Sequence, residues 1–173
     1  EGNSKACSDA AVMLGEEMAR QQLTLVYGGS SLGMMGQLAI AMQGAGGKVI
    51  GVIPKAMIEL EVPLSNLDEM IIVDSMAERK RLMMEKSDAF IAMPGGLGTL
   101  EEVFETWSSI RLGMLGNKPL AFLNIENYYD HLFTFMQTCE QFGFVTHEQN
   151  RIPQVYHTVP ELVSGLCARI RTS

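Results

Sequence analysis

One stretch, residues 88–102, constrains the fold more than any other part of this sequence. A mainly apolar run, residues 88–93, is followed by Pro94, three glycines and a helical pattern that opens with two carboxylates. A short hydrophobic run of this kind is typical of a parallel strand that is buried on both faces. A buried strand, a glycine-rich turn and a helix in this order predict an α/β protein.

The glycines of this turn predict a phosphate site. Gly95, Gly96 and Gly98 carry no side chain that would stand between main-chain N–H groups and a ligand. Turns that lead into a helix in this way bind phosphate groups. We expect Thr99 to cap the helix and to offer its hydroxyl to a phosphate oxygen.

An alternative explanation of the same residues is purely structural. Thr99 and Glu102 have the spacing of a capping box, in which the two side chains only satisfy N–H groups at the start of a helix. A simple cap does not require glycines, however, and open α/β sheets bind ligands at the carboxyl ends of their strands. These glycines favour a ligand site, and the capping alternative stays open.

Strands and helices alternate along the rest of the sequence. This alternation predicts a single α/β domain over residues 1–173, with a parallel sheet covered by helices on both faces. No strand pattern precedes the first helical pattern, so we expect a first strand to be missing at the front. The expected strands are residues 24–27, 48–53, 69–73, 88–93, 119–123 and 155–158, and the later helices are 76–86, 128–142 and 160–170.

A second glycine-rich turn follows the strand at residues 24–27. Gly28 and Gly29 open it, but the turn lacks the strict G-x-G-x-x-G pattern of dinucleotide-binding proteins. The next strand ends in Pro54 and Lys55, where such proteins carry a carboxylate for the ribose. The sequence therefore argues against an NAD-dependent dehydrogenase.

Arg79 is expected on the buried side of the helix at residues 76–86. Met76, Arg79 and Met83 share one face of this helix. A charged group on a buried face needs a partner. Two interpretations stay open: a structural ion pair or an arginine whose charged end reaches water, or an arginine that meets an anion or the Glu102 carboxylate.

Composition narrows the classes of partner. The formal charge of −7 and pI near 4.9 argue against a surface that coats nucleic acid. No apolar run is long enough to cross a membrane. The three cysteines are isolated and odd in number, which indicates a reducing compartment, so we expect a cytoplasmic protein. The histidines have no metal-ligand spacing, and we expect neither a metal nor another cofactor.

The sequence resembles the cytokinin riboside 5′-monophosphate phosphoribohydrolases, the Lonely Guy family. The family motif P-G-G-x-G-T-x-x-E is met in full by residues 94–102, and the companion element M-x-E-R-K by residues 76–80. Residues 27–36 and 51–54 also look like family segments, so the resemblance covers nearly the whole chain. Such proteins are often labelled lysine decarboxylases, but the sequence has no His-Lys dipeptide to suggest a pyridoxal phosphate site.

The resemblance implies a Rossmann-like fold, a dimer or larger homo-oligomer, and an activity. The reaction is hydrolysis of the N-glycosidic bond of a purine nucleoside 5′-monophosphate, such as a cytokinin riboside or adenosine monophosphate. The products are the free base and ribose 5-phosphate. The site residues that it implies are a catalytic pair, Arg79 and Glu102, and a substrate-binding set, Lys80, Gly95, Gly96, Gly98, Thr99, Gly28, Gly29 and Met76.

Two other classes of function remain as alternatives. A non-hydrolytic carrier of a nucleotide or of the molybdenum cofactor would use the glycine-rich turns, but it would not require Arg79 and Glu102 together. A nucleotide-sensing regulatory domain would bind tightly without turnover. The joint presence of the two residues favours the enzyme.

Overall fold

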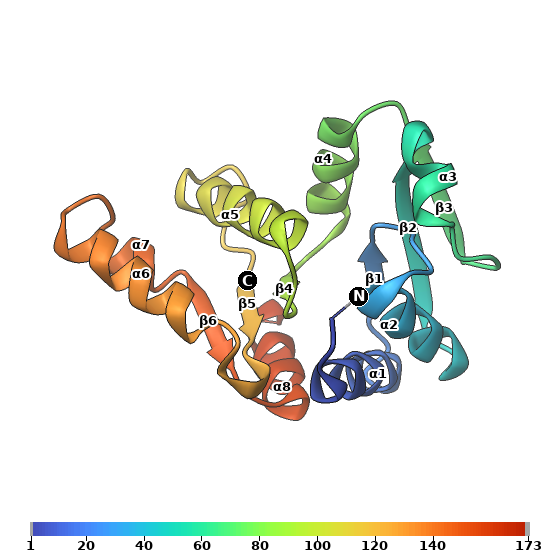
Figure 1. Cartoon of the computed structure of the whole chain (residues 1–173), viewed down its shortest axis with the longest axis horizontal. Coiled ribbons are helices and arrows are strands. Elements are labelled where there is room, and N and C mark those ends of the chain that lie inside the picture. Colours follow the sequence, from blue (N-terminus) through green and yellow to red (C-terminus); the bar gives the residue numbers. More distant parts are fainter. Residues whose placement is uncertain (1, 172–173) are drawn as a thin grey trace. The chain divides into compact units, whose positions relative to one another are not determined.

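The computed structural model describes residues 2–171. It contains two sheets, each made of parallel strands and accompanied by helices (Figure 1). The chain divides into two compact units, residues 1–87 and residues 88–173, and each unit contains one three-stranded sheet. The predicted α/β class with parallel strands is therefore confirmed. A single domain over residues 1–173 stays a prediction.

The first unit is built on a sheet with the strand order β1-β2-β3. Its strands are β1 (Thr24–Tyr27), β2 (Lys48–Pro54) and β3 (Glu69–Val73). Its helices are α1 (Lys5–Arg20), α2 (Gly33–Gly44), η1 (Lys55–Met57), α3 (Ile58–Glu61) and α4 (Met76–Lys86). The helix predicted at residues 76–86 and the strands predicted at 24–27 and 69–73 are confirmed at these bounds.

Local sequence signals explain where the long helices of this unit begin and how they pack. The Ser4 hydroxyl caps α1 by accepting from the Cys7 amide at 3.2 Å, and the Ser75 hydroxyl caps α4. Helices α1 and α2 lie in close contact. A Cβ atom added to Gly15 of α1 would be only 2.5 Å from the Leu38 carbonyl oxygen of α2. Glycine is therefore required where these two backbones meet.

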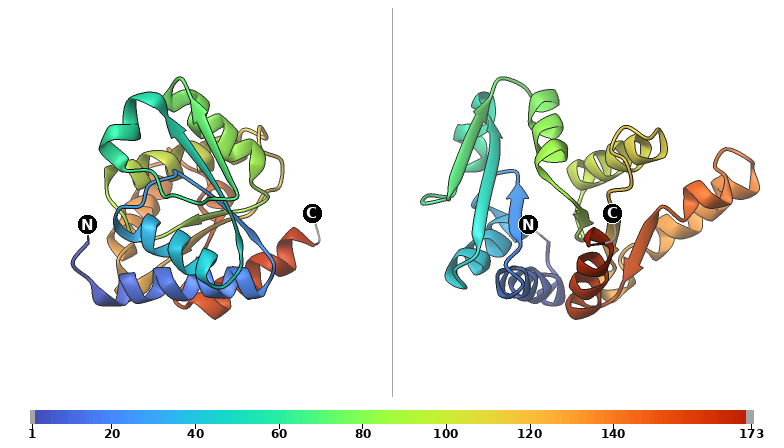
Figure 2. Two further views of the ribbon diagram at one scale, coloured as in Figure 1. Left: turned by 90° about the vertical axis from the view of Figure 1, so that its right-hand side faces the viewer. Right: turned by 180° about the vertical axis from the view of Figure 1, so that it is seen from behind.

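The second unit has the strand order β4-β5-β6 (Figure 2). Its strands are β4 (Phe90–Ala92), β5 (Leu120–Leu123) and β6 (Pro153–Tyr156). Its helices are α5 (Leu97–Arg111), η2 (Ile125–Asn127), α6 (Asp130–Gln141), α7 (His147–Asn150) and α8 (Val159–Ile170). Helix α8 packs against β5 and β6 with an apolar face that includes Leu162 and Val163.

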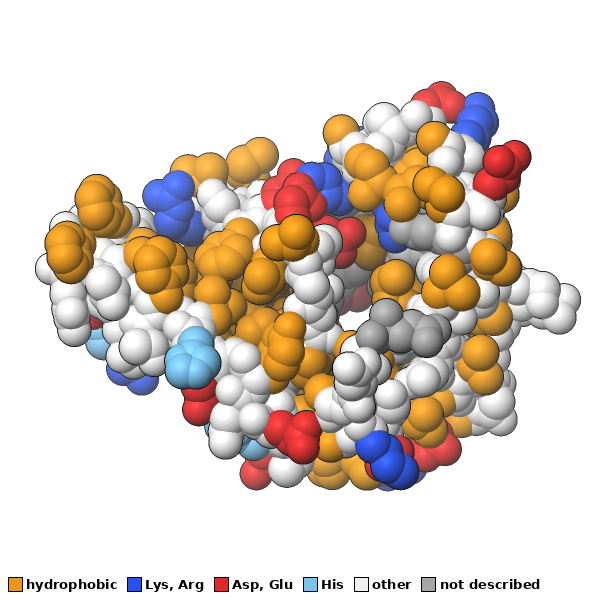
Figure 3. Space-filling model, in the orientation of Figure 1, with side chains coloured by type: hydrophobic (Ala, Val, Ile, Leu, Met, Phe, Trp, Pro, Cys, Tyr) orange, Lys and Arg blue, Asp and Glu red, His pale blue; other side chains and the backbone are white. Residues whose placement is uncertain are grey.

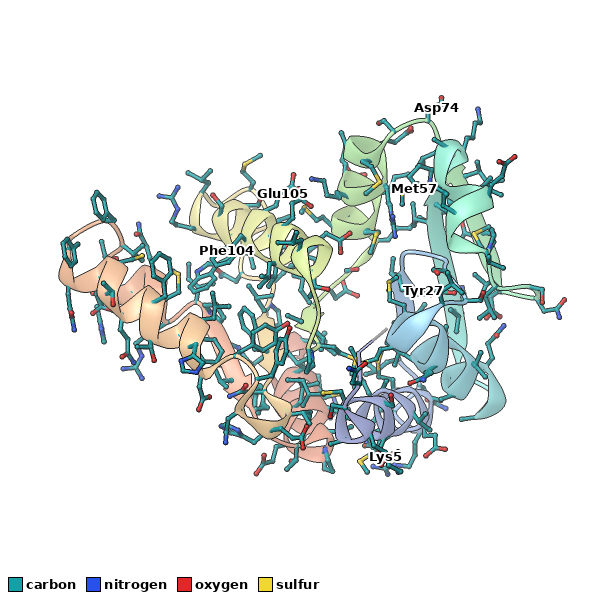
Figure 4. All side chains as sticks on the ribbon, viewed as in Figure 1. Lys5, Tyr27, Met57, Asp74, Phe104 and Glu105 are labelled. Atoms are coloured by element: carbon teal, nitrogen blue, oxygen red, sulfur yellow. The ribbon has the colours of Figure 1, made fainter. Side chains whose placement is uncertain are left out.

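Aromatic side chains form the core of the second unit. Phe122 of the fully buried β5 meets the Tyr129 ring edge-to-face, with centroids 4.9 Å apart, and the Trp107 ring at 6.3 Å. Phe104, which is labelled in Figure 4, stacks on Trp107 of the same helix, with ring centroids 5.8 Å apart. This cluster ties α5 and the start of α6 to the central strand, so the loops at the carboxyl ends of β4 and β5 are anchored.

Two sequence predictions about the second unit are wrong. The strand predicted at residues 88–93 is only three residues long, and Phe90 and Ile91 are half-buried rather than covered on both faces. In the described part of the chain β4 pairs with β5 alone, so it is an edge strand and has less cover than an inner one. The last strand lies two residues earlier than predicted, at Pro153–Tyr156.

Candidate active site

The turn between β4 and α5 leads directly into a helix that no side chain caps. Gly96 is the N-cap residue of α5, and it makes no side-chain capping hydrogen bond. The Leu100 amide donates to the Gly96 carbonyl oxygen at 3.0 Å, which closes the first helical turn. The amides before Leu100 have no acceptor within the helix, and they carry the positive end of its dipole. This geometry suits an anionic group.

The position of this helix start excludes the capping-box explanation. Helix α5 begins at Leu97, so Thr99 is already its third residue and Glu102 lies one turn further on. The prediction that Thr99 caps the helix is wrong, because a capping oxygen would have to come from position 96, which is a glycine. Glu102 is half-buried and is not part of a cap.

The glycines of this turn differ in what the fold demands of them. A Cβ atom on Gly95 would lie 2.2 Å from Oγ1 of Thr99, so packing within the turn requires this glycine. A Cβ atom on Gly96 or on Gly98 would meet no atom within 4 Å, and neither residue has a positive φ. The fold itself therefore gives no reason for glycine at these two positions, which border open space.

Arg79 lies buried in the first unit, with 4% of its surface exposed. Its Nη2 donates to the Gly28 carbonyl oxygen at 3.3 Å, and its Nη1 lies 3.8 Å from the Sδ atoms of Met76 and Met57. Of these residues, Met57 is labelled in Figure 4. An arginine that extends its charged end into water is thus excluded. These contacts hold the guanidinium at the carboxyl end of β1, and a guanidinium has donors that suit a carboxylate or a phosphate.

The glycine-rich turn after β1 is filled by the protein itself. A Cβ atom on Gly28 would lie 1.9 Å from Nη2 of Arg79, so the arginine occupies the space that a side chain would need. Gly29 has a φ of 82°, and its carbonyl oxygen accepts from the Leu64 amide at 3.0 Å. The Ser31 amide donates to the Val62 carbonyl oxygen at 3.0 Å. The segment before β3 therefore fixes this turn by two backbone hydrogen bonds.

Tyr27 is a residue that sequence analysis did not single out. Its hydroxyl is buried and has no hydrogen-bond partner within residues 2–171. Burial raises the pKa of Tyr27 to about 12, because loss of solvent disfavours the charged phenolate. A tyrosine at the end of a strand is ordinary in sequence, and only the packing shows that its hydroxyl is buried.

The predicted site residues thus fall into two sets. Gly28, Gly29, Met76, Arg79 and Lys80 belong to the first unit, and Gly95, Gly96, Gly98, Thr99 and Glu102 belong to the second. Within the first set Arg79 contacts Gly28 and Met76, and the half-buried Lys80 follows it on α4. The pairing of Arg79 with Glu102 joins the two sets and stays a prediction.

Two other features, a metal cluster and a membrane-spanning helix, are absent from the described residues. Between residues 2 and 171, no three or more His, Cys, Asp or Glu side chains gather in a group that could hold a metal ion. No helix in that range is long and apolar enough to cross a membrane.

Comparison with known proteins decides the family. The pattern of a family described as "possible lysine decarboxylase" matches residues 35–166. A protein of Oryza sativa subsp. japonica, named "probable cytokinin riboside 5′-monophosphate phosphoribohydrolase", is 42% identical over 95% of this chain and 72% of its own length. The cytokinin riboside 5′-monophosphate phosphoribohydrolase LOG5 of Arabidopsis thaliana is 41% identical over the same shares. This chain belongs to the Lonely Guy family.

A solved structure has a fold similar to that of this Lonely Guy chain. The molybdenum cofactor binding protein of the phototrophic bacterium Rippkaea orientalis superposes with a TM-score of 0.73, over 98% of this chain and 91% of that protein. The two sequences are only 20% identical, so the likeness shows a shared fold and nothing of the ligand.

Proposed function

We propose that this Lonely Guy protein hydrolyses the N-glycosidic bond of a purine nucleoside 5′-monophosphate, either a cytokinin riboside monophosphate or adenosine monophosphate (AMP). The products are the free base and ribose 5-phosphate. The observation that carries the proposal is the identity of about two residues in five with proteins named as phosphoribohydrolases, over 95% of the chain. The uncapped, glycine-rich start of α5 supports it from the structure.

The first part of the mechanism is a grip on the 5′-phosphate. The amides of the turn at Gly95, Gly96 and Gly98 bind its oxygens, Thr99 adds a hydroxyl, and Lys80 contributes positive charge. The open space at Gly96 and Gly98 supports this assignment. Because the phosphate is distant from the bond that breaks, its binding energy serves to hold the ribose in register.

The second part is stabilisation of charge at the sugar. Cleavage of an N-glycosidic bond builds an oxocarbenium-like state, and Glu102 stabilises it or positions the attacking water, as carboxylates do in glycosidases. Arg79 orients Glu102, keeps it ionised and helps to hold the substrate. Gly28 and Met76 contribute by fixing the guanidinium, to which both are already in contact. Gly29 completes the turn beside them.

The decisive experiment changes the charge of Glu102 alone. We expect Glu102→Gln to fold normally and to release adenine from AMP roughly 100- to 1000-fold more slowly, as when a transition-state contact is lost. Glu101→Gln is the matched control, because it makes the same change one residue earlier on the exposed side of α5. Undiminished turnover by Glu102→Gln would exclude Glu102 as a catalytic residue.

A carrier that binds without hydrolysis is the second candidate. The fold shared with a molybdenum cofactor binding protein favours it, although that likeness concerns the fold alone. Chromatography of AMP incubated with the purified protein separates the candidates. An adenine peak that grows with time supports the hydrolase, whereas bound and unchanged AMP supports the carrier.

We propose a homodimer as the working state. Hydrophobic side chains reach the surface in several places on the face that Figure 3 shows. In the second unit, the side chains of Phe135, Phe142 and Phe144 are 61%, 74% and 82% exposed, which is unusual for phenylalanine. Light scattering coupled to size-exclusion chromatography measures the mass, and a monomer at micromolar concentration contradicts this proposal.

We also propose a cytoplasmic location. Cys7, Cys139 and Cys167 are all free thiols, which suits a reducing compartment. Fractionation of the source cells with an antibody against the chain tests this location.

A further inference from the structure

Two consecutive tyrosines bind the backbone of the glycine-rich turn before α5. The Tyr128 hydroxyl donates to the Gly95 carbonyl oxygen at 2.8 Å, and the Tyr129 hydroxyl donates to the Met93 carbonyl oxygen. Both tyrosines come from the segment between β5 and α6, more than 30 residues further along the chain. The turn is therefore held from outside at two of its carbonyl groups.

The Tyr128 contact determines which way an amide points. The peptide bond between Gly95 and Gly96 is planar and trans, so its C=O and its N–H point in opposite directions. A hydroxyl that holds the Gly95 carbonyl on one side therefore turns the Gly96 N–H to the other. Glycine backbone rotates freely without such a contact. The Tyr128 hydroxyl thus supplies an orientation that the turn lacks by itself.

The segment that carries the tyrosines is itself held firmly. Asn124 is 1% exposed, its Oδ1 accepts from the Tyr129 amide at 2.7 Å, and its Nδ2 donates to Oδ1 of Asp130 at 2.8 Å. The Tyr129 ring packs on Phe122 in the core. These contacts fix the position from which Tyr128 reaches the turn.

Backbone strain occurs directly before Tyr128. Glu126 and Asn127 have φ values of 52° and 58°, in the left-handed region that disfavours residues other than glycine. Asparagine tolerates this region, whereas glutamate seldom adopts it. Strain of this kind persists where surrounding contacts over-determine the conformation, and it is frequent at functional sites.

We infer that Tyr128 is a positioning residue, whose hydroxyl orients the Gly95–Gly96 peptide so that the Gly96 N–H faces the substrate's phosphate. The inference rests on the proposed function, because it deepens the role assigned to this turn. Tyr128 acts through the backbone and does not touch the substrate. Tyr129 anchors the entry to the same turn but also belongs to the core, so Tyr128, with half of its surface exposed, is the residue to test.

The test variant is Tyr128→Phe, which removes only the hydroxyl. We expect the KM for AMP and the inhibition constant of inorganic phosphate to rise together, each about tenfold, as for the loss of one orienting hydrogen bond. We expect kcat at saturating AMP to change much less than KM. Loss of folded protein would instead lower kcat per mole of enzyme and leave both constants unchanged.

Tyr156→Phe is the matched control. The Tyr156 hydroxyl donates to Oε1 of Gln154 at 2.7 Å within β6, so the control removes a hydroxyl hydrogen bond of similar length away from the turn. Unchanged KM and inhibition constants in Tyr128→Phe, or equal changes in Tyr156→Phe, would overturn the inference.

Calorimetry separates this inference from the proposed function. AMP is titrated into Glu102→Gln, in which slow turnover leaves AMP intact during the titration, and into the Glu102→Gln, Tyr128→Phe double variant. We expect Kd to be about tenfold higher in the double variant. Equal Kd values contradict the positioning role alone, whereas tight AMP binding by the unmodified protein without adenine release contradicts hydrolysis alone.

Discussion

The two glycine-rich turns look alike in sequence but differ in what surrounds them. In the turn after β1, a Cβ atom on Gly28 would strike Arg79, and the backbone at Gly29 needs a positive φ. In the turn after β4, a Cβ atom on Gly96 or Gly98 would meet nothing within 4 Å. The first turn is glycine-rich because the protein fills it. The second has glycines that the fold does not need, which points to a ligand as the reason.

The helices that follow the two turns also differ in how the backbone before them is hydrogen-bonded. Neither α2 nor α5 has a side-chain cap. Before α2, however, amides of the turn already donate within the protein: the Ser31 amide to the Val62 carbonyl oxygen and the Leu32 amide to the Ser30 hydroxyl. Before α5, tyrosine hydroxyls bind carbonyl groups and leave the amide side of the turn to other partners. Of these two helix starts, only that of α5 is therefore expected to bind an anion.

Among variants of the two turns, Gly28→Ala is expected to lose the most activity. The new Cβ displaces the Arg79 guanidinium, and a catalytic group moved by about 1 Å can cost about 100-fold in rate, so we expect kcat/KM for AMP to fall by about that factor. Stability changes little, because the group that must move is the end of a flexible side chain. Gly44→Ala is the control, since its Cβ meets nothing within 4 Å. Full activity in Gly28→Ala would show that the space at Gly28 is not needed to place the Arg79 guanidinium.

Gly98→Ala tests the turn before α5. Alanine at an exposed helical position gains roughly 0.5–1 kcal/mol over glycine, so we expect a higher melting temperature. The added methyl group enters the space assigned to the phosphate, so KM for AMP rises in the same protein. A more stable variant with unchanged KM would show that no ligand occupies this space. Gly44→Ala again serves as the control, with KM unaltered.

The smallest effect is expected for Tyr27→Phe. If the first turn is packed only for the fold, removing a buried hydroxyl without a partner among residues 2–171 stabilises the protein by about 0.5 kcal/mol. Chemical denaturation measures this gain, and KM for AMP stays constant. A raised KM would instead show that the Tyr27 hydroxyl meets the substrate, and the first turn would then also be a ligand turn.

Much of the fold follows from local patterns. The strand at residues 69–73 and the helix at 76–86 are confirmed, because hydrophobic periodicity and helix-start signals such as the Ser75 cap are properties of neighbouring residues. The short helix α7 was not predicted, although Thr146 and Gln149 form a capping box that could have revealed it. The edge position of β4 could not be predicted, because it depends on which strands pair.

The candidate site divides in the same way. The positions of the glycines, the arginine and the carboxylate are read directly from the sequence, and the motifs that they form place the chain in its family. The start of α5 at Leu97 without a cap, the burial of Arg79 against Gly28 and the hydrogen bond from Tyr128 to Gly95 appear only in the folded chain. The Arg79 and Tyr128 contacts each join residues that are distant in sequence, and the start of α5 depends on where β4 stops. A local sequence pattern does not predict such contacts, because they depend on how distant parts of the chain pack together.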